Sequence, residues 1–188
     1  IDFVGITQPI TKWSYQIRRA EDIPWAVARA FYIARSGRPG PVVLDFAKNA
    51  QTAMIEYAPQ TVDFIRSYNP VPETQPGSIE MAAELINQSV KPLMLVGQGV
   101  ELAGARQELL ALCEKAQIPF GQTMLGLSAA PTGHPLNMGM LGMHGNLAPN
   151  VMTNQCDLLI AVGMRFDDRV TGDLHTYAKQ AKVIHFEI

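Results

Sequence analysis

Apolar residues recur along the chain at spacings that predict alternating helices and strands. In residues 20–35 they return every three or four positions, which is the period of an amphipathic helix. Asp22 is the expected N-cap of this helix, and Pro24 suits its first turn. The glycines and prolines of residues 36–41 end the helix, and residues 42–44 predict a short buried strand. The apolar positions of the helix are Ile23, Val27, Ala30, Phe31 and Ala34.

The same alternation continues from residue 78 to the end of the chain. Ser78 is the expected cap of a helix that ends before Lys91 and Pro92, and a second amphipathic helix is predicted at residues 102–116. Strands that alternate with helices predict an α/β fold, a Rossmann-like parallel sheet with helices on both faces. The remaining predicted elements are strands at 93–96, 118–120, 158–162 and 182–187, and a helix near 146–155.

Residues 49–77 separate these two regions. They contain four prolines and little periodicity, which is the composition of an interdomain linker. We therefore expect three parts, at residues 1–48, 49–77 and 78–188. Because a single strand cannot form a sheet, we interpret the first part as the remnant of another α/β domain, and the third as a domain truncated at its C-terminus.

Composition excludes several classes of function. The 188 residues are 47% hydrophobic, which is typical of a globular protein. The net charge is −2 and the charged residues do not form blocks, so the sequence has no basic surface of the kind that binds nucleic acid. Apolar runs fall short of the roughly 18 to 20 residues that span a bilayer, and no targeting signal is recognisable, so we expect a cytoplasmic protein without a membrane partner. Cys113 and Cys156 are too few for a disulfide framework or a zinc cluster. The chain starts without methionine, so it is processed or is a piece of something longer.

Unusual residues follow several of the predicted strands. Gly97, Gln98 and Gly99 follow the strand at 93–96, and glycine-rich residues 121–126 follow the strand at 118–120. Glu187 ends the last strand, where an acid can accept hydrogen bonds from a ribose. Each of these signals is weak, and the first departs from G-x-G-x-x-G. Because ligands bind beyond the carboxyl ends of parallel strands, the set together predicts a nucleotide-like cofactor.

The segment "MGMLGMHG", residues 138–145, places three methionines and three glycines around His144. We expect the glycines to prevent regular helix or strand, so that the methionines line a loop suited to a flat ring system. A structural role for a lone histidine is the alternative. No spacing typical of a metal site, no G-x-S-x-G and no P-loop is present, and no nucleophile stands out.

Four charges follow the strand at 158–162 within five residues, and they are Arg165, Asp167, Asp168 and Arg169. A solvated cluster at the start of a helix would account for them with pairs worth at most about 0.5 kcal/mol each. A binding role would instead have the aspartates hold the two guanidinium groups in place.

Three segments closely resemble the catalytic large subunits of the acetohydroxyacid synthase (acetolactate synthase) family of thiamine-diphosphate enzymes. They are "SGRPGPVVLDFAKNAQ", "GMLGMHGNLAPN" and "DLLIAVGMRFDDRVTG". The resemblance implies that the chain comprises the end of a pyrimidine-binding domain and most of a central domain that carries FAD. In this family FAD is not changed in the net reaction and organises the site.

The resemblance also implies roles for individual residues. Arg38 matches an arginine that contacts FAD from the neighbouring domain, and Gln98 replaces a usual small residue. Glu187 stands where aspartate is more common, at the adenosine end. The implied FAD-binding residues are Arg38, Gly97, Gln98, Gly99, Thr123, Met124, Leu141, Gly142, Met143, His144, Gly163, Met164, Arg165, Phe166, Asp167, Glu187 and Ile188.

A substrate channel is implied beside the flavin, formed by Lys48, Met143, Asp168 and Arg169. Arg169 is suited to pair with the carboxylate of a 2-keto acid. Lys48 matches the lysine of a family "PKD" motif, which here reads "AKN", with Ala47 and Asn49 in place of proline and aspartate.

The implied reaction condenses pyruvate with pyruvate or 2-ketobutyrate, with loss of CO2, in branched-chain amino-acid biosynthesis. Thiamine diphosphate carries the chemistry, held through Mg2+. The activating glutamate and the Gly-Asp-Gly diphosphate motif of the family do not occur in these 188 residues, so we expect no catalytic residue here and no carboligase activity from the piece alone. A homodimer or tetramer and a regulatory small subunit are the implied partners.

Three other interpretations remain open. The chain could be a free-standing module that binds FAD, ADP or NAD, or part of a sibling carboligase or decarboxylase whose central domain is empty or binds ADP. A purely structural role is disfavoured, because glycine-rich loops at successive strand ends cost conformational entropy without helping the core.

Overall fold

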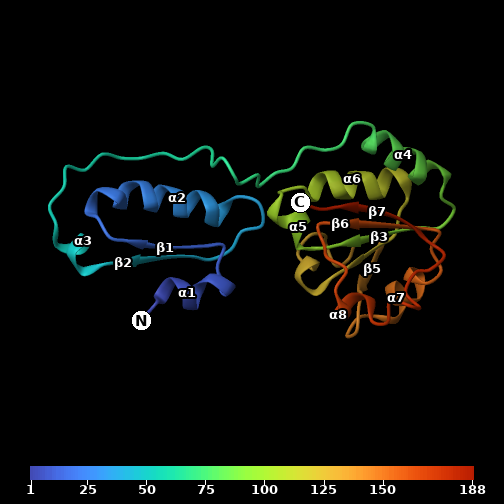
Figure 1. Ribbon diagram of the computed structural model, residues 1–188. Helices are drawn as coiled ribbons and strands as arrows, with labels where there is room; N and C mark the ends of the chain where they lie inside the picture. Colours follow the sequence, from blue (N-terminus) through green and yellow to red (C-terminus); the bar gives the residue numbers. More distant parts are fainter. The chain divides into compact units, whose positions relative to one another are not determined.

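The computed structural model describes residues 1–188, and the chain divides into two compact units. The first comprises residues 1–73 together with Ile188, and the second comprises residues 74–187 (Figure 1). The division falls between Glu73 and Thr74, inside the range 49–77 in which we expected a linker. Each unit is described by itself.

The first unit is a two-stranded parallel sheet with helices. Strand β1 (Trp13–Ile17) pairs with β2 (Val42–Phe46), and α2 (Ile23–Arg35) connects them. Trp13 and Tyr15 project from the same face of β1 and pack with Trp25 of α2. The other elements of this unit are α1 (Phe3–Thr7), η1 (Gln8–Ile10), η2 (Ala20–Asp22) and α3 (Lys48–Thr52).

Part of the expected linker is anchored on this first unit. The Nζ of Lys12 donates to the carbonyls of Ile33 and Ser36, both at 2.6 Å, and to the hydroxyl of Tyr68 at 2.9 Å. Gly37, with φ of +58°, lies against Pro70. The residues around position 68 therefore belong to the packing of the first unit.

The second unit is a five-stranded parallel sheet in the order β5-β4-β3-β6-β7. The chain starts in the centre, moves outward through β4 and β5, and then returns to add β6 and β7 on the other side. This is the Rossmann order, with its topological switch point between β3 and β6. The strands are β3 (Pro92–Val96), β4 (Phe120–Gln122), β5 (Asn137–Met140), β6 (Leu158–Val162) and β7 (Lys182–Phe186).

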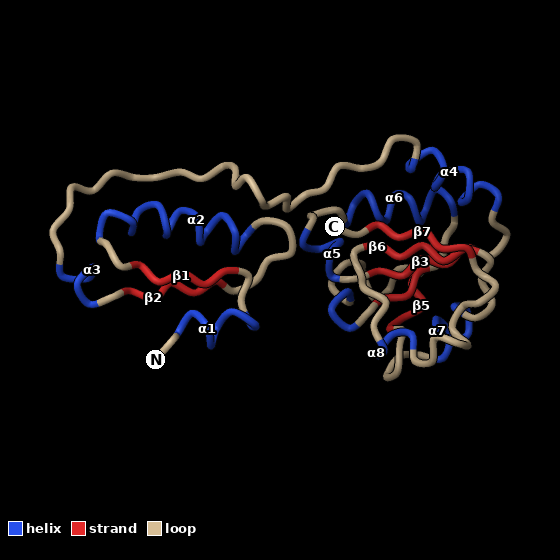
Figure 2. The backbone as a smooth tube through the Cα atoms, in the orientation of Figure 1, coloured by secondary structure: helices blue, strands red, loops and turns tan.

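Helices cover both faces of this sheet, as the alternating pattern predicted (Figure 2). On one face Met94, Val96 and Ile160 pack with the helices that follow β3. On the other face Leu95 and Leu159 pack with the segments that follow β5 and β6. The helices of this unit are α4 (Ser78–Gln88), α5 (Gln98–Leu102), α6 (Arg106–Ala116), η3 (Met124–Gly126), α7 (Leu147–Thr153) and α8 (Asp168–Thr171).

The predicted helix ends were only partly correct. Asp22 is the N-cap of α2, as predicted, but its backbone has helical angles and its side chain makes no capping bond. Gly77, with φ of +79°, is the N-cap of α4, and Ser78 instead donates to the carbonyl of Gln75. The helix predicted at 102–116 is α6, which begins only at Arg106, and a separate short helix, α5, ends at Leu102 before Gly104, whose φ is +67°.

Two strands were missed, and one was misplaced. The strand predicted at 118–120 is β4, which begins at Phe120, so Gly121 and Gln122 lie in the sheet and not in a loop. Met138 and Met140 lie in β5 and not in a loop. The first unit contains β1, so its second strand does not stand alone.

Candidate functional site

The switch point between β3 and β6 is closed by backbone contact. The amide of Gly97 donates to the carbonyl of Val162 at 2.9 Å, and the amide of Gly99 donates to that of Gly163 at 2.8 Å. A Cβ on Gly97 would collide with the carbonyl oxygen of Gly163, and one on Gly99 would lie 2.5 Å from the Gly163 Cα. These glycines are therefore required for the approach of two loops, and Gln98 begins α5 with its side chain exposed.

The loop after β4 adds apolar side chains to the same edge. The Thr123 amide donates to the carbonyl of Val96 at 2.9 Å, and the Thr123 hydroxyl accepts the Gly126 amide at 3.2 Å. This turn leaves Met124 65% exposed and Leu125 63% exposed. Such exposure of two large apolar residues beside the switch point is a feature of surfaces that bind apolar groups.

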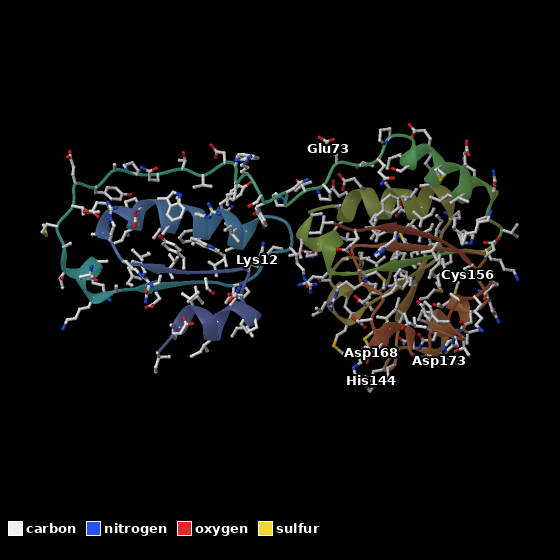
Figure 3. The ribbon with its side chains drawn as sticks, viewed as in Figure 1. Lys12, Glu73, His144, Cys156, Asp168 and Asp173 are labelled. Atoms are coloured by element: carbon white, nitrogen blue, oxygen red, sulfur yellow. The ribbon has the colours of Figure 1, made fainter.

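The loop after β5 is tied to the start of α8. Leu141 is buried, while Gly142 adopts φ of +97° and exchanges two hydrogen bonds with the Asn150 side chain, both at 2.9 Å. The Met143 amide donates to the carbonyl of Arg169 at 2.8 Å. The side chains of Met143 and His144 are exposed. Figure 3 labels His144 and Asp168, which lie at the same end of the second unit.

The turn at residues 163–167 is fixed at most of its positions. The Gly163 amide donates to the Phe186 carbonyl at 2.9 Å, the Met164 side chain is 4% exposed, and the Phe166 ring is partly buried. Asp167 is the N-cap of α8 and accepts the amides of Arg169 at 3.1 Å and Val170 at 3.3 Å. These bonds leave the side chain of Arg165, which is 64% exposed, as the part of the turn that faces solvent.

The four charges of this turn form two surface pairs. Arg165 lies 3.8 Å from Asp167, and Arg169 lies 3.5 Å from Asp168, with both side chains of the second pair more than 70% exposed. Such exposed pairs contribute little stability. The hydrogen bonds that Asp167 makes as a helix cap are shorter than its contact with Arg165, so its main local role is to begin α8.

The remaining predicted residues fall at different places. Glu187 directly follows β7, so it reaches the same sheet edge. Exposed Arg38 and Lys48 lie in the first unit, Arg38 in the loop before β2 and Lys48 at the start of α3. Ile188, the exposed last residue, is grouped with the first unit and not with the second.

One residue of this edge was missed by sequence reasoning. His185 of β7 lies with its Nε2 atom 2.7 Å from the carbonyl oxygen of Met164. The available signal was a histidine inside the apolar strand "KVIHF", close to the end of that strand.

The carboxyl ends of the strands thus bring together residues 97–99, 123–124, 141–144, 163–167 and 187, because all five strands are parallel. At this edge the glycines allow the loop backbones to touch, because they have no side chain that would collide. The side chains of Met124 and Met143 are exposed. These features fit a flat ring system joined to a nucleotide.

Two cavities lie away from this edge. One, of about 670 Å3, is in the first unit, and its lining includes Tyr32, Phe64 and Tyr68. The other, of about 250 Å3, is at the amino edge of the second sheet and includes Lys91 and Cys156. No group of three or more metal-ligating side chains is present. None of the helices combines the length and apolar character needed to cross a bilayer.

Comparisons with known proteins show the family to which the chain is similar. Residues 79–188 match the family described as "Thiamine pyrophosphate enzyme, central domain". Over its full length the chain is 45% identical to a probable acetolactate synthase large subunit of Methanocaldococcus jannaschii, and it covers 32% of that protein. It is 43% identical over its full length to the acetolactate synthase isozyme 1 large subunit of Escherichia coli, of which it covers 33%.

A solved structure is also similar. It is a putative thiamin diphosphate-dependent enzyme isolated from Mycobacterium smegmatis, with a TM-score of 0.74 and 25% sequence identity, and the match covers 97% of this chain and 35% of the other. The chain therefore spans about a third of the length of the relatives that it matches.

Proposed function

Because the chain belongs to the thiamine pyrophosphate enzyme family, we propose that it is part of an acetolactate synthase large subunit. The support is the name shared by relatives that are 43% to 45% identical over the whole of this chain. The whole protein would condense two 2-keto acids, pyruvate with pyruvate or 2-ketobutyrate, with loss of CO2. Thiamine diphosphate, held through Mg2+ by other parts of that protein, supplies the electron sink for this chemistry.

In this proposal the second unit holds FAD at the carboxyl edge of its sheet. The observation that supports it is the switch point between β3 and β6, where glycine turns meet beside uncovered methionines. Backbone groups of residues 97–99 and 163–164 would lie along the diphosphate, and Met124 and Met143 would contact the ring system. The carboxylate of Glu187 would accept hydrogen bonds from a ribose.

The residues proposed for the substrate channel are Lys48, Met143, Asp168 and Arg169. The Arg169 guanidinium is exposed and only loosely paired, so it is free to bind a carboxylate in the bidentate manner. Arg38 and Lys48 belong to the first unit, and their contributions to FAD and substrate remain predictions from the resemblance.

The 188-residue chain alone is proposed to form no acetolactate, since it spans about a third of its relatives. Cytoplasmic localisation, assembly into a dimer or tetramer, and pairing with a regulatory small subunit are proposals for the whole protein. The last of these is supported by the "large subunit" in the names of the relatives.

A titration of the purified chain with FAD, ADP and NAD tests the cofactor proposal. We expect FAD to bind with the highest affinity of the three. The change in flavin fluorescence is the measurement of its binding. Preference for NAD would support a free-standing nucleotide-binding module instead, and preference for ADP would support a sibling carboligase or decarboxylase. Formation of acetolactate by the chain with pyruvate, FAD, thiamine diphosphate and Mg2+ would contradict its proposed inactivity.

A further inference from the structure

The Met164 carbonyl has a single side-chain partner from another element of the fold, which is His185. Nε2 of His185 lies 2.7 Å from the Met164 oxygen, within normal hydrogen-bonding distance. A carbonyl oxygen can only accept, so the ring must carry its proton on Nε2. The hydrogen bond therefore fixes both the tautomer of His185 and the direction of the Met164 carbonyl.

The same imidazole also contacts the side chain of Phe166. The two ring centroids are 5.2 Å apart with an interplanar angle of 69°, and Phe166 also contacts Tyr177 at a centroid distance of 6.3 Å. Tyr177 is partly buried, and this burial raises the pKa of its hydroxyl to about 12. Phe166 thus contacts two aromatic rings that come from outside its own turn.

His185 completes the fixation of the turn at residues 163–167. Gly163 is held by the backbone of β7, and Asp167 is held as the cap of α8. Between these two points, His185 contacts both Met164 and Phe166. Arg165, which lies between them in sequence, therefore has its backbone direction set by groups that His185 holds.

We propose that His185 is a positioning residue for the cofactor site, because its Nε2–H fixes the Met164 carbonyl and sets the direction in which the turn presents Arg165 to an anionic nucleotide ligand. The inference rests on the proposed binding of FAD and deepens it. The role is indirect, since His185 acts through the turn. The carboxylate of Glu187 also lies near the His185 ring, with one oxygen 3.8 Å from Nε2.

The test compares the unmodified chain with three variants. His185→Leu removes the donor, His185→Gln keeps an N–H at a similar reach, and His175→Leu is the control, because His175 is exposed and its imidazole makes no hydrogen bond. Affinity for FAD is measured by flavin fluorescence. Hydrogen exchange of the amides of residues 164–166 is measured without ligand, and far-UV circular dichroism checks that each variant is folded.

We expect His185→Leu to weaken FAD binding roughly fivefold to tenfold, the equivalent of one net hydrogen bond, and to speed exchange in the turn. His185→Gln should restore both values to within about twofold, and His175→Leu should change neither. Equal affinity in His185→Leu and the unmodified chain, or no restoration by glutamine, would overturn the inference.

Failure of the two proposals can be distinguished. If the unmodified chain binds no FAD, the proposed cofactor is wrong and the role of His185 toward that ligand is overturned with it, whatever the exchange rates show. If FAD binds but the variants match the unmodified chain, only the role of His185 is wrong. Should His185→Leu fail to fold, the nitrogen-15 spectrum of the unmodified chain decides: an Nε2–H tautomer supports the inference, and an Nδ1–H tautomer overturns it.

Discussion

Single residues decide how closely the loops at the switch point approach each other. Gly99 and Gly163 touch through their backbones, with the amide of one bonded to the carbonyl of the other at 2.8 Å. The sequence predicted glycines at the ends of the strands and assigned them to a ligand. It could not show that they also touch each other, because this contact joins loops more than sixty residues apart in the chain.

Gly99→Ala tests this contact. The added Cβ would lie 2.5 Å from the Cα of Gly163, so we expect a loss of about 2 kcal/mol in the free energy of unfolding, measured by urea denaturation. Gly133→Ala is the matched control, since no atom lies within 4 Å of its Cβ and its φ is not positive. We expect the control to change stability by no more than about 0.5 kcal/mol. Equal effects at the two positions would show that the close approach is not what makes Gly99 necessary.

The charges of residues 165–169 show the limit of residue-level prediction. Composition identified an unusual cluster, and the expectation that aspartates pair with arginines agrees with the two contacts seen. The start of a helix was one of the two interpretations of this cluster, and α8 begins there. The cap made by Asp167 was not predicted, because α8 has only four residues and gives no periodic signal.

At the scale of elements, we expect the stability of α8 to depend on its N-cap, Asp167, and not on Asp168, its first residue. Asp167→Ala removes the acceptor of two backbone amides, so we expect a loss of about 1 kcal/mol in the free energy of unfolding. Asp168→Ala removes only an exposed pair with Arg169 and should cost at most about 0.5 kcal/mol. Thermal unfolding of both variants measures the two losses of stability. A larger loss of stability in Asp168→Ala than in Asp167→Ala would contradict the assignment of Asp167 as the cap.

Long elements were predicted well from sequence, and short ones were not. The periodic pattern located α2, α4, β3 and β6 to within a few residues. Strand β5 was missed because the glycines of residues 138–145 suggested a loop. Asn137 and Met140 nevertheless pair with β4 across an irregular register, with Gly139 at φ of +96° between them. Strand β1 was missed although Trp13, Tyr15 and Ile17 alternate with polar residues, which is a strand pattern.

At the scale of the whole molecule, the two units have separate hydrophobic cores. Ile17, Ala26 and Ala50 form the core of the first unit, and the buried clusters on the two faces of the larger sheet form that of the second. The order of the five strands could not be predicted, because the helical and strand periods of a sequence do not specify which strands are neighbours.

Separate cores predict separate unfolding. The two tryptophans, Trp13 and Trp25, both lie in the first unit, so tryptophan fluorescence reports on that unit alone. We expect its urea transition to differ in midpoint from the transition seen by far-UV circular dichroism, which is dominated by the larger second unit. Coincident transitions with both probes would show that the chain unfolds as one cooperative structure.

The contact between Gly99 and Gly163 also limits how the chain can recover from mutation. When two side chains pack too tightly, shrinking one of them commonly restores the fit, so damaging changes in a core often have second-site suppressors. Here both partners already lack a side chain, and the obstruction is the main chain itself. A genetic selection for revertants of Gly99→Ala should therefore return glycine at position 99 and find no compensating change at position 163.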